Sequence, residues 1–308
     1  MISKKQNTVL KRGFNFFQDF KLEELLNIIR FGLPVKRGMI IQIRKDNFSG
    51  LPEPVFFMST GRCGTQWFAK LLSKGKKTMV FHEPKPNFDS QGKKLYQLFI
   101  KHNFDLPDTI QEAYKEVFMT GRERYLRYSY KTEKRFIETN NHLTFFAPII
   151  NSVLPSVKFV HLIRHPGDFV RSAIRRRFYS DSNIRIQKRI VPVSGPHLEQ
   201  WNNYDSVEKN SWLWNATNNF IENFKNVSKS KNIYTFNFNT LSVDKIEALL
   251  NFLELSISKK NIKKLLHVKV NVQKGGKYKQ YADWSQHDKN KLIKICGSLA
   301  KKYNYNLK

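Results

Sequence analysis

Residues 59–66, Ser-Thr-Gly-Arg-Cys-Gly-Thr-Gln, place one positive side chain between two glycines. The apolar run 55–58 before them predicts a short buried strand, and the apolar positions of 67–72 recur at helical spacing. A strand–turn–helix unit of this kind directs backbone N–H groups and the positive end of a helix dipole at one point, which favours a phosphate-like anion. Thr65 and Gln66 stand where a Walker A loop needs Lys and a Ser or Thr hydroxyl for Mg²⁺. The pattern therefore indicates an anion held by amides and Arg62 rather than a metal–nucleotide complex.

A second anion-binding pattern follows the apolar run 158–163. Pro166 suits the first position of the helix that comes next. Arg164 is therefore expected at the carboxyl end of a strand, where open parallel sheets bind ligands. Ser172 follows two helical turns later, and a guanidinium fork with a hydroxyl can hold a second phosphate. The alternative is that Arg164 simply pairs with Asp168.

These two patterns need a sheet to bring them together. Further apolar strands and helical segments alternate along the chain: strands near 80–81, 135–138 and 232–238, and helices in 92–130, 197–229, 243–266 and 285–303. Strands separated by helical crossovers predict an α/β fold with a mainly parallel central sheet flanked by helices. Residues 1–50 are expected to form an N-terminal accessory helical segment, and 51–308 a single domain.

Together the two motifs resemble those of the sulfotransferases that use 3′-phosphoadenosine 5′-phosphosulfate (PAPS). The first motif of that family is a strand–loop–helix with a basic residue, Gly and Thr, here 62–67. The second is a strand that ends in Arg with a Ser eight positions later, here Arg164 and Ser172. The stretch 269–278 resembles the family's last cofactor loop. The resemblance runs from about residue 54 to 305 and implies a P-loop NTPase-like sulfotransferase fold.

The resemblance also implies a site for PAPS or its product PAP, with no metal required. It places the 5′-phosphosulfate on the amides of 62–66, with Arg62 neutralising the bridging oxygen, and the 3′-phosphate on Arg164 and Ser172. Trp67 either stacks on adenine or packs in the core. The implied cofactor-binding residues are Arg62, Cys63, Gly64, Thr65, Gln66, Trp67, Arg164, Ser172, Lys274, Gly275, Gly276 and Lys277. Gln66 and Cys63 depart from the family's common hydroxyl residues, but both leave the backbone cradle intact.

Sulfuryl transfer to an alcohol needs a group that takes the proton of the acceptor hydroxyl. Several branches of the family place a Glu after the strand that follows the first motif, which corresponds here to His82-Glu83-Pro84. Glu83 is the first candidate for the base, because Pro84 fixes the backbone after it. His82 is the second candidate, and its structural alternative is to orient the loop. The alternative for Glu83 is an ion pair with Lys85 or an arginine.

Three further residues are expected to contact the acceptor. Glu138 ends the strand near 135–138, Asn140 follows it, and Arg176 belongs to the helix that contains Ser172. For Arg176 the alternative is a solvated helix face.

Composition restricts the partners. Lys and Arg number 54 against 25 Asp and Glu, and the net charge of +29 favours anionic partners, although much of the lysine can be solvated surface. The sequence has no zinc-finger spacing, RNP-type strand or basic heptad region that would indicate binding to nucleic acid. No apolar run approaches the ~20 residues of a membrane-spanning helix, and residues 1–20 lack a signal-peptide pattern. Cys63 and Cys296 have no metal-ligand spacing.

The sequence therefore predicts a cytoplasmic, PAPS-dependent sulfotransferase that acts on a hydroxyl acceptor. A carbohydrate or glycoconjugate, which the positive charge allows to be acidic, is the first expectation for that acceptor. One alternative is a P-loop phosphotransferase or kinase-like enzyme, against which the missing Lys-Ser/Thr argues. Another is a non-catalytic anion- or nucleic-acid-binding protein on the same fold, which would bind polyanions with a steep salt dependence and show no turnover.

Overall fold

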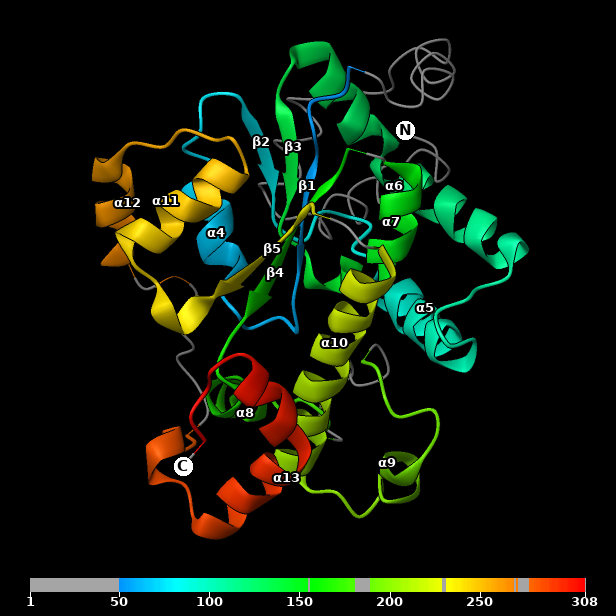
Figure 1. Cartoon of the computed structure of the whole chain (residues 1–308), viewed down its shortest axis with the longest axis vertical. Helices are drawn as coiled ribbons and strands as arrows, with labels where there is room; N and C mark the ends of the chain where they lie inside the picture. The colour runs from blue at the N-terminus through cyan, green and yellow to red at the C-terminus, as the bar shows by residue number, and fades with distance from the viewer. Residues whose placement is uncertain are drawn as a thin grey trace, which may run out of the picture.

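The computed structural model describes residues 50–154, 156–180, 189–228, 231–268, 270 and 277–307. A five-stranded sheet lies at its centre in the order β2-β3-β1-β4-β5, and every neighbouring pair is parallel (Figure 1). The strands are β1 Val55–Met58, β2 Thr78–Phe81, β3 Arg135–Glu138, β4 Lys158–Ile163 and β5 Ile233–Asn237. This confirms the α/β class and the parallel central sheet.

Helices cover both faces of the sheet (Figure 1). One face carries α4 Thr65–Leu72, α11 Val243–Phe252 and α12 Lys259–Leu266. The other carries α5 Asp89–Lys101, α6 Asp108–Thr132, α7 Ala147–Val153 and α10 Ser206–Ser228. Beyond the carboxyl end of β4 lie α8 Pro166–Arg175 and α13 Gln286–Lys302, and α9 Pro196–Glu199 precedes α10. Short 3-10 turns are η1 Asn141–Phe146, η3 Phe238–Thr240 and η4 Tyr281–Asp283.

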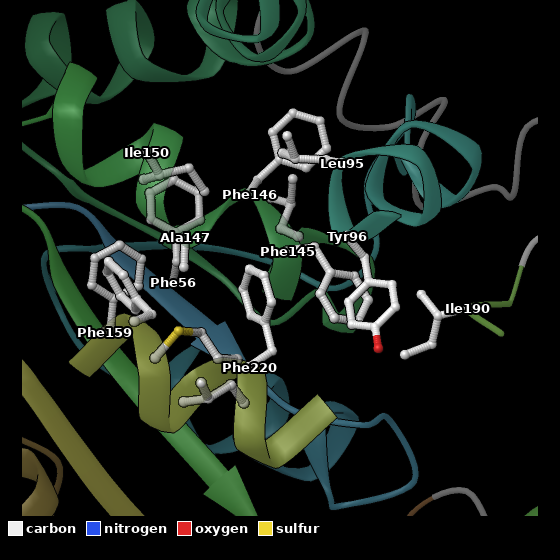
Figure 2. Packing of buried hydrophobic residues seen from close by; sticks show 14 of the residues in the cluster. Phe56, Leu95, Tyr96, Phe145, Phe146, Ala147, Ile150, Phe159, Ile190 and Phe220 are labelled. Carbon is white, nitrogen blue, oxygen red and sulfur yellow. The ribbon is translucent and has the colours of Figure 1, made fainter. Parts of the chain in front are cut away.

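Both faces of β1 are buried, which explains its unbroken apolar sequence. Successive side chains of a strand point to opposite faces. Phe56 packs on the α6 and α10 side, within 5.8 Å of Phe118, whereas Phe57 packs on the α4 side, within 5.5 Å of Phe68 (ring centroids). Figure 2 shows the first of these two cores, in which the aromatic rings of η1 and α10 meet.

The expected elements are present with shifted bounds. The helical region 92–130 is two helices, since α5 ends at Lys101 and α6 begins at Asp108, after Pro107. The region 197–229 likewise divides into α9 and α10, and 243–266 into α11 and α12. Of the expected accessory segment, only Gly50 lies within the described residues, so that segment and the domain boundary stay predictions.

Parallel pairing brings the carboxyl ends of all five strands to one edge of the sheet. The segments that leave this edge are 59–64 after β1, 82–88 after β2, 139–140 after β3 and 164–165 after β4. Because β1 lies between β3 and β4, its turn is adjacent to the segments that follow both. Among the described residues, no helix is both long and apolar enough to cross a membrane.

Candidate active site

The turn between β1 and α4 has the backbone of an anion cradle. Gly61, Arg62 and Gly64 have φ values of 75°, 56° and 97°, in the left-handed region that favours glycine. Gly64 is the N-cap of α4 and offers no side chain to the free N–H groups of the first helical turn. A Cβ atom at Gly64 would lie 2.2 Å from the ring of Phe238, so this position has room for glycine alone. The cradle therefore depends on backbone geometry, and the N–H groups at the start of α4 can bind an anion.

Side-chain contacts from within the turn and from η1 hold this turn. The Cys63 thiol is buried and donates to the Gly61 carbonyl at 3.1 Å, with Thr60 Oγ1 at the same distance. Burial raises the pKa of the Cys63 thiol, so it stays protonated and packs as a neutral group. Thr144 of η1 bonds both the N–H and the carbonyl of Ser59. The thiol of Cys63 is thus engaged within the turn, and the contribution of its amide to a bound anion stays a prediction.

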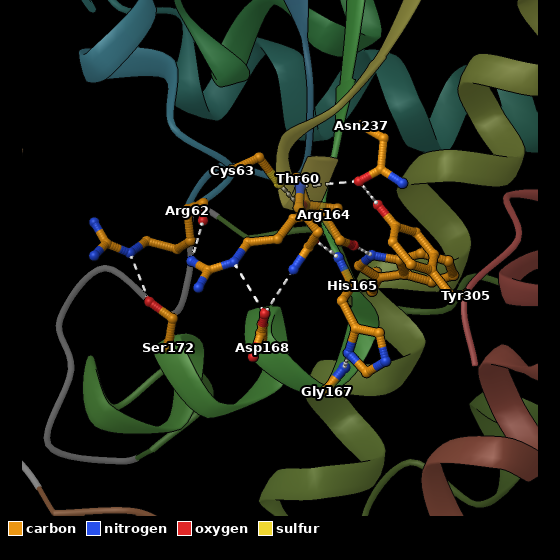
Figure 3. A network of polar contacts seen from close by, with 12 residues as sticks. Thr60, Arg62, Cys63, Arg164, His165, Gly167, Asp168, Ser172, Asn237 and Tyr305 are labelled. Carbon is orange, nitrogen blue, oxygen red and sulfur yellow. Dashed lines mark hydrogen bonds and ion pairs between the residues drawn. The ribbon is translucent and has the colours of Figure 1, made fainter. Parts of the chain in front are cut away.

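Arg164 and Ser172 meet the turn at Arg62. The Nη1 group of Arg164 donates to the Arg62 carbonyl at 3.1 Å, and Nε of Arg62 donates to the Ser172 hydroxyl at 3.1 Å (Figure 3). The indole N–H of Trp214 donates to the Arg164 carbonyl at 2.9 Å. The structure therefore brings together the basic residues of the two motifs, which are separated by about a hundred positions in the sequence.

The charges around Arg62 are unbalanced. Burial lowers the pKa of the Arg62 guanidinium, the positive charges of Arg176 and Arg164 lower it further, and Glu83 opposes the shift. Arg176, at the end of α8, thus lies within electrostatic range of Arg62. Cations that repel one another while partly shielded from water are stabilised by an added anion. The electrostatics favour a bound anion beside these arginines.

The alternative contact of Arg164 is also present. Its Nε lies 3.8 Å from Asp168 Oδ2, which is an ion pair too long for a hydrogen bond. The same Nε is buried and has no hydrogen-bond partner among the residues that the structure describes. Asp168 Oδ2 instead accepts from Asn239 Nδ2 at 2.9 Å. Pairing with Asp168 therefore leaves donor capacity on Arg164.

The start of α8 contacts Asn306, and the neighbouring Tyr305 contacts β5. His165 caps the helix, because its Nδ1 accepts from the Gly167 N–H; its Nε2 then carries the proton and donates to the Asn306 carbonyl at 3.0 Å. The hydroxyl of Tyr305 donates to Asn237 Oδ1 at 2.8 Å (Figure 3). Sequence reasoning missed this support, since nothing near Arg164 in the sequence points to residues 305–306.

Glu83 lies in the loop after β2, partly exposed, with a left-handed φ of 50°. Among the described residues its carboxylate forms no hydrogen bond or ion pair, including with Lys85, and its charge acts on Arg62. His82 differs, since its Nδ1 lies 2.9 Å from the Thr139 carbonyl and 3.1 Å from Thr139 Oγ1. His82 thus has the contacts of a residue that orients the loop, whereas the Glu83 carboxylate has no partner among the described residues and lies within electrostatic range of Arg62.

The structure corrects the role expected for Glu138 and Asn140. Both are 0% exposed. Glu138 accepts two hydrogen bonds from Arg122, at 2.6 and 2.7 Å, and one from Asn140 Nδ2 at 2.9 Å. Asn140 Oδ1 caps η1 by accepting the His142 N–H. Their polar atoms are used inside the protein, so neither residue contacts an acceptor directly.

The remaining predicted residues divide into three groups. Trp67 is 5% exposed, and its indole N–H donates to the Leu265 carbonyl at 3.1 Å, which favours core packing over adenine stacking. Thr65 is buried and Gln66 is exposed at the start of α4. Lys274, Gly275 and Gly276 lie outside the described residues, whereas Lys277 is described and exposed.

A cleft of about 660 Å³ opens beside α8. Its lining includes four basic residues and two aromatic ones, along with one acidic residue: Arg171, Arg175, Lys277, Lys279, Tyr278 and Trp284, with Asp288. The Nε of Arg171, the residue before Ser172, donates to the Tyr278 carbonyl at 3.1 Å. This bond fixes one cation at the wall of the cleft.

Comparisons with known proteins give similarity in structure only. No family model and no curated protein matches the chain. Among solved structures, the sulfotransferase domain of the Synechococcus PCC 7002 olefin synthase is 13% identical, covers 83% of this chain and 97% of its own, and has a TM-score of 0.47. The sulfotransferase domain from the curacin biosynthetic pathway is 14% identical, with coverages of 84% and 100% and a TM-score of 0.47. Sulfotransferase STF9 from Mycobacterium avium is 10% identical, with coverages of 90% and 83% and a TM-score of 0.48. All three are sulfotransferases, but identities and TM-scores this low carry no argument about the activity of this chain.

Proposed function

We propose that this protein is a PAPS-dependent sulfotransferase that moves a sulfuryl group to a hydroxyl acceptor. One observation carries the proposal: at the edge of the sheet Arg164 donates a hydrogen bond to the Arg62 carbonyl, and the Arg62 side chain donates one to the Ser172 hydroxyl. A glycine-lined turn and the free carboxylate of Glu83 complete the arrangement. A nucleotide with two anionic groups and a hydroxyl that must lose a proton match these groups.

The residues present fit such a donor. The left-handed φ values of Gly61 and Gly64 give the turn a backbone whose N–H groups, with those at the start of α4, can bind a phosphosulfate. The buried Nε of Arg164, which lacks a hydrogen-bond partner, can bind a 3′-phosphate together with Ser172. Gln66 offers an amide in place of the hydroxyl that binds Mg²⁺, so we propose that binding needs no metal.

The chemistry then divides among the side chains. PAPS supplies an activated sulfuryl group whose leaving group is a phosphate. A Glu83 carboxylate oxygen would accept the proton of the acceptor hydroxyl while the hydroxyl oxygen attacks the sulfur atom of the sulfuryl group. The Arg62 guanidinium stabilises the negative charge that develops on the departing phosphate oxygen. Arg164 and Ser172 orient the nucleotide, and His82 keeps the loop of Glu83 in place through Thr139.

For the acceptor we propose a carbohydrate or glycoconjugate that carries an anionic group. The cleft beside α8 supports this choice, because aromatic faces pack against sugar rings and guanidinium groups bind carboxylates and sulfates. Tyr278 and Trp284 supply the rings, and Arg171 and Arg175 the charges. Arg176, at the end of the same helix, lies within electrostatic range of Arg62 and can guide an anionic acceptor toward the donor.

The test is transfer of label from ³⁵S-labelled PAPS to pools of neutral and acidic oligosaccharides, in buffer containing EDTA. We expect labelled product, with more from the acidic pool than from the neutral one. Phosphoryl transfer that depends on Mg-ATP would replace the proposal with a phosphotransferase. Saturable PAP binding without turnover on any hydroxyl pool would replace it with an anion-binding protein.

A further inference from the structure

A buried ion pair lies against the loop that carries Glu83. Arg122 of α6 and Glu138 of β3 are both 0% exposed, and their two hydrogen bonds of 2.6 and 2.7 Å form a bidentate contact. Removing two charges from water costs free energy, which a pair of apolar side chains of similar volume would avoid. Packing alone therefore does not account for these residues.

The pair and its neighbours contact the loop 82–88 at several points. Arg122 Nη2 donates to the Pro84 carbonyl at 3.5 Å, and its guanidinium carbon lies 4.6 Å from the centroid of the Phe88 ring. Asn140, which also bonds Glu138, donates to the Asn87 carbonyl at 3.3 Å. The backbone of α6 approaches so closely that a Cβ atom at Gly121 would lie 2.2 Å from the Phe88 ring.

These contacts hold a backbone that is unfavourable by itself. Glu83 and Phe88 have φ values of 50° and 61°, and side-chain-bearing residues persist in this region only where their surroundings impose it. The surrounding bonds go to the backbone of Pro84 and Asn87 and to the ring of Phe88. The carboxylate of Glu83 takes part in none of them and keeps its charge within range of Arg62. The network fixes the loop 82–88. It leaves the Glu83 carboxylate without a partner among the described residues and within electrostatic range of Arg62.

We propose that Arg122 and Glu138 are positioning residues that hold the Glu83 carboxylate beside Arg62. They touch neither donor nor acceptor and act through the loop 82–88. The catalytic consequence rests on the proposed function, but the effect on the loop does not.

The experiment replaces the pair by apolar residues, Arg122→Met with Glu138→Leu, so that no unpaired charge stays buried. Lys158→Met is the matched control. Lys158 is also largely buried and forms an ion pair with Glu254 at 2.6 Å. It differs in its location, because it lies at the start of β4, at the opposite end of the strands from the loop 82–88. Hydrogen exchange of the 82–88 amides, PAP titration and turnover are measured on each protein. In the double variant we expect loop exchange to rise on the order of tenfold, turnover to fall about 100-fold, and PAP affinity to stay within twofold. The control should match the wild type in all three measurements.

A double-mutant cycle with Glu83→Gln separates positioning from general stability. If the pair acts through Glu83, the loss from Arg122→Met with Glu138→Leu should nearly vanish in the Glu83→Gln background. Gly121→Ala serves as a second variant if the double variant fails to fold, because its Cβ pushes Phe88 while the ion pair stays. Unchanged loop exchange in both variants, or losses that add to that of Glu83→Gln, would overturn the proposal. A wild-type protein that binds PAP and transfers nothing would defeat the proposed function, while loop exchange would still decide the positioning role.

Discussion

The turn after β1 and the loop after β2 leave the same edge of the sheet, but they are held in place in different ways. The turn 59–64 takes its shape mainly from its own residues: Gly61, Arg62 and Gly64 are left-handed, and its thiol and hydroxyl groups bond carbonyls one or two residues away. Distant residues add to this, since Thr144 bonds Ser59 and Arg164 bonds the Arg62 carbonyl. The loop 82–88 has no such internal bonds among the described residues and relies on α6 and on the segment after β3, through Arg122 and Asn140. The shape of the proposed anion site is thus encoded mostly by local sequence, whereas the position of the proposed base depends on residues 38 and 53 positions away.

This difference predicts how each region responds to substitution. Changes inside the turn should weaken binding of the nucleotide, because its amides are the proposed ligand contacts. Changes around the loop should slow turnover and leave the nucleotide's affinity intact, because the loop carries the proposed proton acceptor. The predictions that follow separate these two outcomes.

The largest effect is expected for Glu83→Gln. The substitution keeps the shape and hydrogen-bonding capacity of the side chain and removes its ability to accept a proton, so turnover should fall by roughly 10²–10⁴-fold. PAP affinity should hardly change. Single-turnover rates and calorimetric PAP titrations measure the two quantities. His82→Asn is the comparison, and we expect a smaller loss there, since His82 bonds Thr139. If Glu83→Gln is fully active, Glu83 is not the base. If His82→Asn is inactive at the same time, His82 is the base.

Arg164→Ala should weaken PAP binding strongly. A charge-assisted phosphate contact is worth about 1.5–3 kcal/mol, which corresponds to roughly 10- to 150-fold in affinity. Adenosine 5′-phosphosulfate lacks the 3′-phosphate that Arg164 is proposed to bind, so its affinity should be nearly unchanged. Titration of both ligands against both proteins gives the contrast. Equal losses for the two ligands would place Arg164 away from the 3′-phosphate.

Gly64→Ala should damage the turn itself. The residue has a φ of 97°, and a Cβ atom would lie 2.2 Å from the Phe238 ring, so backbone or ring must shift. Left-handed strain costs about 1–3 kcal/mol, and we expect a lower melting temperature and about tenfold weaker PAP binding. Gly195→Ala is the matched control, with a φ of 73° but nothing within 4 Å of the added carbon. Its PAP affinity should equal that of the wild type.

The same contrast explains what the sequence could predict. The turn after β1 and the Arg164–Ser172 pair could be predicted from the sequence, because the residues that define each motif lie close together in the chain. Glu138 was misassigned because its position at a strand end resembles that of Glu83. Its burial depends on Arg122, a charged residue within a long helix whose hydrophobic pattern gives no sign of an inward-facing cation.

Contacts between residues far apart in the sequence also decide other roles that the sequence alone could not assign. Trp67 occupies a helix position suited equally to the core or to a ligand, and only its bond to Leu265, 198 positions away, favours the core. The links from His165 and Asn237 to the chain end are equally invisible in sequence. Parallel pairing itself was predictable, because apolar strands alternate with helices.

The smallest effects are expected at Cys63, and they test whether the turn is held by backbone or by side chain. Cys63→Ser retains a donor for the Gly61 carbonyl and an acceptor near Thr60, so PAP affinity and melting temperature should stay close to those of the wild type. Cys63→Val keeps the volume but removes the donor, and one hydrogen bond contributes about 0.5–1.5 kcal/mol. We therefore expect a lower melting temperature for Cys63→Val and PAP affinity reduced by no more than about tenfold. Thermal denaturation with and without PAP measures both. If Cys63→Val abolishes binding while its fold survives, the thiol rather than the glycine backbone shapes the cradle, and the contrast between the two loops fails.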